Sequence, residues 1–368
     1  MSRAIAVAVL LLTFHARAQD AGVTRCLTLA PKEGNPRNSE GSFVTLKDGR
    51  ILFVYTHFTG GAGDNAAAHL AGRFSSDGGR TWTAEDVVVV PREGGMNVMS
   101  VSLLRLGDGR IGLWYLVKNS LEDCRAWMRV STDEAKTWGE ARPCMPERGY
   151  FVVNNDRVAQ LKGGRILVPA ARHDWGKDKE LKGSHRGVAV CFYSDDGGAT
   201  WKQSKSALEA PGKSKSGLQE PLVVELKDGR VMMLCRTDLG CQYRSYSGDG
   251  GVTWSAAEGT EIASPLSPAS VERIPGSGDL MMVWNDHRNV GAEYMGKRTP
   301  LCVAVSKDEG RTWGKSKVIE GDPGGWFCYT AIHFAQDRVL LGYCAGEGKG
   351  NRLGTTAVSS FAIEWLYP

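Results

Sequence analysis

The octet Ser75-Ser-Asp-Gly-Gly-Arg-Thr-Trp82 occurs in the chain five times, with small variations. Its shared template is Ser-x-Asp-x-Gly-x-Thr-Trp, and only the second copy departs from it, with Ala135 at the Gly position. Asp and Gly at this spacing make a tight turn, because the carboxylate accepts backbone N–H groups and Gly adopts a positive φ. The Trp supplies a large apolar plate for packing against a neighbouring unit. The other copies are Ser131–Trp138, Ser194–Trp201, Ser247–Trp254 and Ser306–Trp313.

A second series of turns alternates with the octets and predicts six repeats. Asp-Gly between two apolar runs is the strongest short hairpin signal. The turns recur about every 50 to 65 residues, which is the period of a propeller blade or another repeat array. They are Leu46–Arg50, Leu106–Arg110, Leu161–Arg165 and Leu226–Arg230, with weaker copies at Pro275–Asp279 and Gln336–Arg338.

Each repeat has the pattern of four strands: one before the hairpin turn, one after it, one leading into the octet and one beyond it. The sequence therefore predicts an all-β fold, a six-bladed β-propeller with four-stranded antiparallel blades and octet turns. A short strand at residues 23–29 is expected to complete the last blade. The second strands of the repeats are expected at 51–55, 111–117, 166–171, 231–235, 280–284 and 339–344.

Residues 1–18 have the pattern of a secretory signal peptide. Arg3 provides a positive start, residues 4–14 a short apolar core, and Ala16-Arg-Ala18 a cleavage site of the small-x-small type. The core is too short to span a bilayer, and no later run of that kind occurs, so we expect no membrane span. We expect a secreted or periplasmic protein whose residues 19–368 form a single propeller. The alternative is that the first segment remains as an anchor.

The composition fits an exported all-β protein and argues against other classes. The chain contains 46 Gly and 11 Trp residues, and its formal net charge is +4. The sequence contains no basic stripe of the kind that would indicate a nucleic-acid partner. The histidines show no metal-ligand spacing and no phosphate-binding loop occurs, so the sequence predicts no metal and no cofactor.

The chain has nine cysteines, and this odd number leaves at least one thiol unpaired. Cys328 and Cys344 flank one hairpin. The sequence allows either a disulfide between them or two buried free thiols.

The repeat topology brings polar residues to one end of the central axis. The hairpin turns and octets lie at one end of every blade, so the inner strands begin at the other end. The residue six positions before each hairpin Leu opens an inner strand. These residues are Glu40, Ser100, Asn155 and Glu220, with Pro268 and Tyr329 as approximate equivalents. Arg236, Arg298 and Asp64 are expected at the same end, and such a cluster is the default site hypothesis.

The octets resemble the Asp-box (BNR) repeats of the sialidase superfamily, and residues 19–368 resemble a six-bladed sialidase. Three phrases around the expected mouth strengthen the resemblance. Gly324-Gly-Trp-Phe-Cys-Tyr329 is similar to the nucleophile segment of that family, and Leu218-Gln-Glu220-Pro to its glutamate segment. Met233-Leu-Cys-Arg236 and Lys297-Arg298-Thr-Pro are similar to its arginine segments.

The resemblance implies a secreted exo-glycosidase that removes terminal, acidic, sialic-acid-like sugars from glycans with retention of configuration. It implies Tyr329 as the nucleophile, Glu220 as its base and Asp64 as the acid/base, with Arg236 and Arg298 binding the sugar carboxylate. A tyrosine suits a sugar whose anomeric carbon carries a carboxylate, because an anionic nucleophile would be repelled. The implied partner is a glycan or glycoconjugate.

One departure from the family pattern bears on the substrate. The family opens its first blade with an arginine that completes a triad around the sugar carboxylate, whereas this chain has Glu40 at that register and Arg37 three residues earlier. Asn155, Asp156 and Arg157 face the same mouth and are candidate substrate-orienting residues.

Two other functions remain open on the sequence. The first is a glycosidase or lyase on a different sugar that uses Glu40 and Glu220 as its carboxylates. The second is a propeller that binds glycans without catalysis. Each site residue also has a structural alternative, such as a buried strand tyrosine for Tyr329 or structural ion pairs for the arginines.

Overall fold

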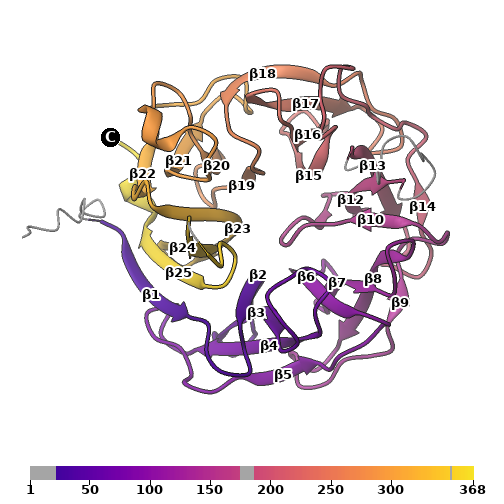
Figure 1. Cartoon of the computed structure of the whole chain (residues 1–368). Helices are drawn as coiled ribbons and strands as arrows, with labels where there is room; N and C mark the ends of the chain where they lie inside the picture. Colours follow the sequence, from indigo (N-terminus) through magenta and orange to yellow (C-terminus); the bar gives the residue numbers. More distant parts are fainter. Residues whose placement is uncertain (1–21, 175–185, 349) are drawn as a thin grey trace, which may run out of the picture.

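The computed structural model describes residues 22–174, 186–348 and 350–368, and the expected signal peptide lies outside these ranges. Within them the fold is all-β, with two single-turn 3-10 segments, η1 (Ala292–Tyr294) and η2 (Ile363–Leu366). The sheets follow one another in chain order around a central axis (Figure 1).

Four of the sheets have four antiparallel strands each, as the sequence predicts for a blade. The first contains β2 (Arg37–Thr45), β3 (Ile51–Phe58), β4 (Ala68–Ser75) and β5 (Val87–Val90). Another contains β15 (Gln219–Glu225), β16 (Val231–Arg236), β17 (Cys241–Ser247) and β18 (Glu258–Ala263). The next contains β19 (Ser270–Arg273), β20 (Leu280–Asn285), β21 (Leu301–Ser306) and β22 (Lys317–Glu320). The last contains β23 (Gly325–Ala335), β24 (Arg338–Glu347), β25 (Thr356–Ala362) and β1 (Thr24–Leu29).

The second and third repeats differ from the expected pair of separate sheets, because they are joined into one nine-stranded sheet. Tyr150 pairs with Cys124 of the second repeat in parallel and with His173 of the third in antiparallel. The third inner strand is also interrupted, with only two short pieces at residues 150–152 and 159–160. The nine strands are β6 (Asn97–Arg105), β7 (Ile111–Lys118), β8 (Cys124–Ser131), β9 (Arg142–Pro143), β10 (Tyr150–Val152), β11 (Ala159–Gln160), β12 (Ile166–His173), β13 (Val188–Ser194) and β14 (Lys202–Gln203).

The six predicted hairpin turns and the strands that follow them are confirmed. Each second strand begins within one residue of its expected start and runs one to three residues beyond its expected end. The first strand is confirmed as well, since β1 pairs antiparallel with β25, with Thr28 opposite Ala357. The N-terminal strand thus completes the last sheet, and it lies at the outer edge of that sheet in Figure 1.

The octets fold as the sequence predicts, and all five use the same hydrogen bonds. In the first octet Asp77 accepts hydrogen bonds from the Thr81 N–H at 2.9 Å and the Thr81 hydroxyl at 2.6 Å. The Ser75 hydroxyl accepts the Gly79 N–H at 2.8 Å. The second octet keeps this pattern with Ala135, which adopts a φ of 61°. The turn geometry therefore survives loss of the Gly, although a side chain rarely adopts this conformation.

The Gly at the fifth position of the octet packs against a side chain of a neighbouring repeat in four copies, and its φ is positive in all four. A Cβ at Gly79 would lie 2.6 Å from Leu340 of the last sheet, and one at Gly198 would lie 2.4 Å from Met128 of β8. Gly251 and Gly310 meet Leu167 and Met232 in the same way. The octets therefore pack adjacent repeats together.

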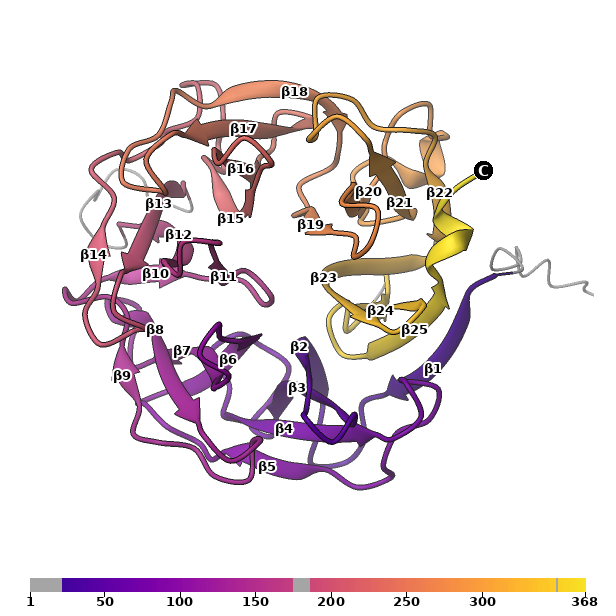
Figure 2. The ribbon, with the colours of Figure 1, turned by 180° about the vertical axis from the view of Figure 1, so that it is seen from behind.

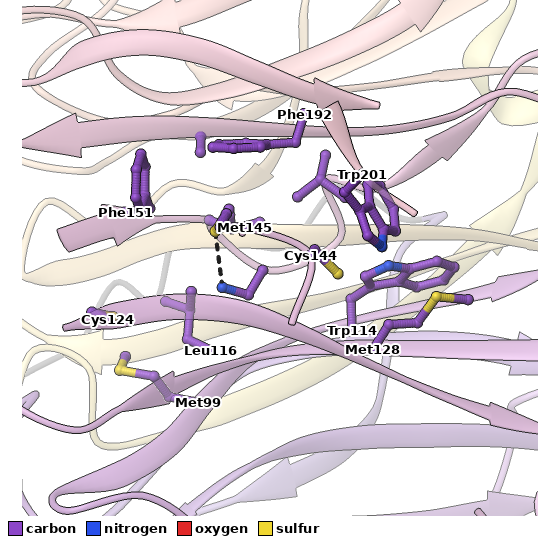
Figure 3. Close-up of a cluster of buried hydrophobic side chains, with 14 of the residues drawn as sticks. Met99, Trp114, Leu116, Cys124, Met128, Cys144, Met145, Phe151, Phe192 and Trp201 are labelled. Carbon is purple, nitrogen blue, oxygen red and sulfur yellow. Dashed lines mark hydrogen bonds between the residues drawn. The ribbon is translucent and has the colours of Figure 1, made fainter. Parts of the chain in front are cut away.

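Apolar clusters between neighbouring sheets form the core. The cluster in Figure 3 lies between the strands of the second and third repeats and contains Trp114, Met128 and Trp201. Phe151 and Phe192 pack edge to face in it, with ring centroids 5.3 Å apart. Figure 2 shows the inner strands around the axis from the opposite side. Because the side chains of this cluster come from two repeats, the repeats stabilise one another.

We expect the stability of the fold to fall steeply in acid because of the octet aspartates. Hydrogen bonds from Thr and Ser lower the pKa of Asp133 and Asp196 to about 2. A carboxyl whose pKa is lower in the folded than in the unfolded state stabilises the protein above about pH 4, and this stabilisation is lost as the pH falls toward 2. Thermal midpoints measured from pH 5 to pH 2 should therefore decrease, and Asp196→Asn should weaken this dependence. A flat profile over this range would contradict the prediction.

Candidate active site

Four inner strands carry a β-bulge at the same place, and each bulge contains one residue with a positive φ. The register shifts lie between Ser39 and Ser42 in β2 and at the equivalent points in β6, β15 and β23. A bulge re-aims a side chain, and a non-Gly residue with positive φ marks a constrained position. The four residues are Glu40 (58°), Ser100 (59°), Glu220 (45°) and Tyr329 (58°). All four are positions that the hairpin register singles out.

The third and fifth repeats differ from this pattern. In the third repeat the positive φ of 57° belongs to Asp156, one residue after the Asn155 that the register selects. In the fifth repeat β19 begins at Ser270, so that Pro268 precedes the strand. Counting residues back from the hairpin turn therefore does not predict the positive-φ position where the inner strand is interrupted or short.

Tyr329 and Glu220 face each other across the axis. The Tyr329 hydroxyl donates a hydrogen bond to Glu220 Oε1 at 3.1 Å, and both side chains are buried. Burial raises the pKa of Tyr329 above its ordinary value. Burial also opposes ionisation of Glu220, but Arg236 and Arg298 outweigh it and lower the pKa of this carboxyl. The pair is therefore a neutral phenol held against a carboxylate that can accept its proton.

The two arginines surround this pair. Arg236 Nη1 donates to Glu220 Oε2 at 2.6 Å. The guanidinium carbon of Arg298 lies 4.9 Å from the centre of the Tyr329 ring and 5.7 Å from that of Trp326. Arg298 Nε also donates to the Leu266 carbonyl at 3.2 Å. The structure thus brings together the tyrosine, glutamate and two arginines that the sequence predicts for the site.

Arg37 is fully engaged within the protein. It is only 1% exposed, and its Nε donates to the Ser39 hydroxyl at 2.9 Å. Its Nη2 donates to Glu40 Oε1 at 3.0 Å and its Nη1 to Asp64. The second oxygen of Glu40 accepts a hydrogen bond from Ser100. Arg37 therefore joins the two carboxylates in place of pointing a free guanidinium into the site.

The two carboxyls on Arg37 differ in their environment. Glu40 is 5% exposed, and burial raises its pKa despite the charge of Arg37. The Asp64 side chain is 61% exposed. The charge of Arg37 lowers the pKa of Asp64, and the charges of Lys118 and Arg298 act in the same direction. Glu40 therefore has the higher pKa of the two carboxyls.

Lys118 and Asn97, which the sequence did not predict as site residues, hold the Asp64 loop in place. Lys118 Nζ donates to the Asp64 carbonyl at 3.1 Å and to Asn65 Oδ1 at 2.9 Å. Asn97 Nδ2 donates to the carbonyls of Asp64 and Ala66 at 2.9 and 2.8 Å. Lys118 is the last residue of β7, as Arg236 is of β16. A basic residue at the end of the second strand of a repeat could therefore have predicted the position of Lys118.

Asn155 and Asp156 use their side chains to tie inner strands together. Asn155 Nδ2 donates to the carbonyls of Gly41 and Tyr329, at 2.8 and 3.0 Å. Asp156 accepts the Ser42 hydroxyl at 2.7 Å and the Ile332 N–H at 2.9 Å. These contacts connect the third repeat to β2 and β23. Asn155 thereby holds the backbone of Tyr329.

Arg157 lies buried beside these residues. Its Nη1 donates to the Ser270 hydroxyl at 3.1 Å, while Nε and Nη2 have no hydrogen-bond partner among the described residues. Burial lowers the pKa of Arg157, although Asp156, Glu220 and Tyr329 oppose this effect.

Within the described ranges, no group of three or more His, Cys, Asp or Glu side chains is arranged to hold a metal ion. No helix in the same ranges has the length and apolar character needed to cross a membrane.

Comparison with known proteins identifies the family. The family model described as a BNR repeat-like domain matches residues 58–343. The sialidase of Micromonospora viridifaciens is 26% identical over 375 residues, covering 92% of this chain and 54% of that protein. The chain belongs to the BNR repeat-like family of the sialidase superfamily. It spans about half the length of the Micromonospora sialidase.

Solved structures show the same fold at lower identity. A protein of unknown function from Dyadobacter fermentans has a TM-score of 0.72 and 20% identity, covering 93% of this chain and all of that one. The sialidase of Trypanosoma rangeli, in a complex with 2,3-difluorosialic acid, has a TM-score of 0.71 and 16% identity. That match covers 95% of this chain and 60% of the trypanosomal one.

Proposed function

We propose that this protein is a retaining exo-glycosidase of the sialidase type, with Tyr329 as the nucleophile. The observation that carries the proposal is the hydrogen bond of 3.1 Å between the buried Tyr329 hydroxyl and Glu220. Tyr343 and Tyr115 also donate to carboxylates that pair with an arginine. Tyr329 differs from them because it lies at the bulge of an inner strand, with two arginines beside the pair. A phenol with a pKa of about 10 is a poor nucleophile until a base takes its proton, and Glu220 lies within hydrogen-bond reach.

We extend the proposal to the arrangement of the sheets around the site. We infer that the sheets are the six blades of one propeller, with the nine-stranded sheet counting as two blades joined through β10. The inner strands then present their bulges at one mouth, and the octets lie at the opposite face. We also infer export through residues 1–18, from the positive start, short apolar core and small-x-small cleavage site of this segment.

In the first half of the reaction Glu220 accepts the phenolic proton while the Tyr329 oxygen attacks the anomeric carbon. The bond to the leaving oxygen breaks, and Asp64 in its protonated form transfers its proton to that oxygen. In the second half Asp64 removes a proton from water, which attacks the anomeric carbon. The bond from this carbon to the Tyr329 oxygen breaks, and Glu220 returns the proton to Tyr329. Two displacements at one carbon retain its configuration.

The substrate of this reaction is a terminal sugar of a glycan or glycoconjugate, with a carboxylate on its anomeric carbon. Arg298 and Arg236 lie on either side of Tyr329 and Glu220 and supply paired N–H donors for that carboxylate. A neutral tyrosine can approach such a carbon without the repulsion that an Asp or Glu nucleophile would meet.

One observation favours a second candidate, a glycosidase for a sugar without this carboxylate. The family arginine of the first blade is replaced by Glu40, and Arg37 has its donors occupied by Ser39, Glu40 and Asp64. Only Arg236 and Arg298 are thus left to bind a sugar carboxylate. In this candidate Glu40, whose pKa burial raises, is the proton donor.

Hydrolysis of a panel of aryl glycosides by the purified protein tests the proposal. The panel holds aryl sialosides, uronides and neutral glycosides, and proton NMR follows the configuration of the first product. We expect the sialoside to be cleaved fastest, with retention. Faster cleavage of neutral glycosides would favour the second candidate, and inversion or no cleavage across the panel would overturn the proposed reaction.

Replacing Arg236 by Met should move the acidic limb of the pH–rate profile to higher pH. Arg236 is the leading cause that keeps the pKa of Glu220 low against the effect of burial. Without it Glu220 stays protonated to a higher pH, and a protonated base cannot accept the phenolic proton. The measurement is kcat/KM from pH 4 to pH 8. Arg230→Met is the matched control, because Arg230 pairs with Asp228 at the exposed hairpin turn. An unshifted limb in Arg236→Met would argue against Glu220 as the base.

A further inference from the structure

Cys328 and Cys344 face each other on neighbouring strands next to the Tyr329 bulge. Cys328 lies on β23 and is directly opposite Cys344 on β24. Opposed residues of an antiparallel pair have Cα atoms about 4.5 to 5.5 Å apart, which is within the range that a disulfide spans. The strand register therefore places the two Cα atoms at bonding separation without movement of the backbone.

The side chains point toward each other as well. The two residues belong to one buried cluster, and both are almost completely buried, at 1% and 0% exposure. They form one cluster with Tyr329, and Trp326 and Leu353 pack against it. Other buried cysteines of the described strands lie opposite different residue types: Cys124 opposite Lys118, Cys191 opposite Pro169, Cys235 opposite Tyr243 and Cys302 opposite Trp284.

The surroundings favour the reactive form of one thiol. Burial works against ionisation of Cys328, but the hydrogen bond with Cys344 and the charge of Arg298 outweigh it, so the pKa of Cys328 is lowered. The thiolate is the nucleophile of thiol–disulfide exchange. In the packed strands Cys328 is therefore the more acidic thiol of the pair.

We propose that Cys328 and Cys344 form an intrachain disulfide by exchange with an external disulfide, such as oxidised glutathione, before β23 and β24 pack. The Cys328 thiolate attacks one sulfur of the reagent and releases the other as a thiolate, which takes the proton of Cys344. The Cys344 sulfur then attacks Cys328 in the mixed disulfide and releases the second thiol. Two protein thiols are oxidised, and one external disulfide is reduced to two thiols.

The bond would fix the strand that holds the bulge. Cys328 immediately precedes Tyr329, whose φ is 58°, and the register of β23 shifts between Cys328 and Ala331. A covalent link at the start of this shift reduces the conformational freedom of the unfolded chain. It also restrains the bulge when the strands open locally. It should raise the thermal midpoint by a few degrees. This inference is independent of the proposed glycosidase function.

Peptide mapping tests the pairing directly on the full chain. The protein is refolded in a buffer of oxidised and reduced glutathione, denatured, alkylated and digested with trypsin. Cleavage after Arg338 places the two cysteines on different peptides, 318–338 and 339–349, each with a single cysteine. We expect these peptides to be linked by a disulfide that dithiothreitol cleaves, while the peptide that carries Cys302 is alkylated.

Thermal midpoints of the oxidised and reduced protein provide the second measurement. We expect reduction to lower the midpoint in the wild type and in the matched control Cys302→Ser, and to leave it unchanged in Cys344→Ser. Alkylation of both Cys328 and Cys344 in correctly refolded protein would overturn the proposal, as would a link from either residue to another cysteine. The mapping uses only the wild type, so it holds even where a variant fails to fold.

Discussion

Tyr329→Phe is expected to reduce turnover by at least about 10³-fold while leaving the fold intact, because it removes the proposed nucleophilic oxygen and nothing else. Glu220→Gln should slow turnover by about 10² to 10⁴-fold, the usual contribution of a general base. The two losses should not add in the double variant, since both residues serve the same step. The measurement is kcat and kcat/KM on the best substrate of the glycoside panel.

Tyr343→Phe is the matched control for this prediction. Tyr343 is a buried tyrosine of β24, and its hydroxyl contacts Glu320 and Ser359, away from the site. It should lose stability but keep kcat. Far-UV circular dichroism and the thermal midpoint verify folding of each variant. Full activity in Tyr329→Phe would contradict the proposed role of this residue.

Glu40→Gln is expected to raise kcat/KM for an anionic sugar by about tenfold. Two unit charges about 6 Å apart repel by about 3 kcal/mol at an effective dielectric constant of 20, and Arg37 offsets part of this. A remainder of about 1.4 kcal/mol corresponds to a factor of ten. Gln keeps an oxygen for Arg37 Nη2 and an amide group for Ser100, so the network retains its shape.

The pH dependence sharpens this second experiment. A carboxyl with a raised pKa is neutral below that pKa and charged above it, so the advantage of Glu40→Gln should grow as the pH rises. A neutral aryl glycoside serves as the control substrate, and its kinetics should change little. If Glu40→Gln abolishes turnover but leaves ligand binding intact, Glu40 is catalytic and the second candidate function replaces the first.

The parts of the fold that depend on short-range signals could be predicted from the sequence. The octets and hairpin turns are local structures, in which Asp, Gly and Thr at fixed spacing determine the hydrogen bonds. The positions of Glu40, Ser100, Glu220 and Tyr329 on the inner strands followed from the hairpin register. The sequence predicted that they open these strands, whereas they lie at bulges within them. The pairing of β1 with β25 could be inferred because the last repeat lacks an outer strand of its own.

The third repeat could not be predicted in the same way. Its inner strand is replaced by a polar segment in which Asn155 and Asp156 bind the backbones of β2 and β23. These are contacts between residues more than one hundred positions apart, and no local pattern encodes them. For the same reason the sequence did not reveal the parallel pairing of Tyr150 with Cys124 that joins two sheets.

The charged residues of the site could likewise be predicted only in part. Residue identity and register placed Tyr329, Glu220, Arg236 and Arg298 together, and the structure agrees. The partners of Arg37 depend on the path of the Asp64 loop, which Lys118 and Asn97 hold from the second repeat. Because loop paths follow from tertiary contacts, the sequence left the role of Arg37 open.

Covalent trapping of the glycosyl-enzyme tests the central claim most directly. The wild-type protein is incubated with a fluorinated sugar matched to its best substrate, digested with trypsin and mapped by tandem mass spectrometry. The account predicts that the mass of the sugar is added to peptide 318–338, on Tyr329, its single tyrosine, and that Tyr329→Phe loses the adduct. An adduct on Glu40, Glu220 or Asp156 in the active enzyme would contradict it.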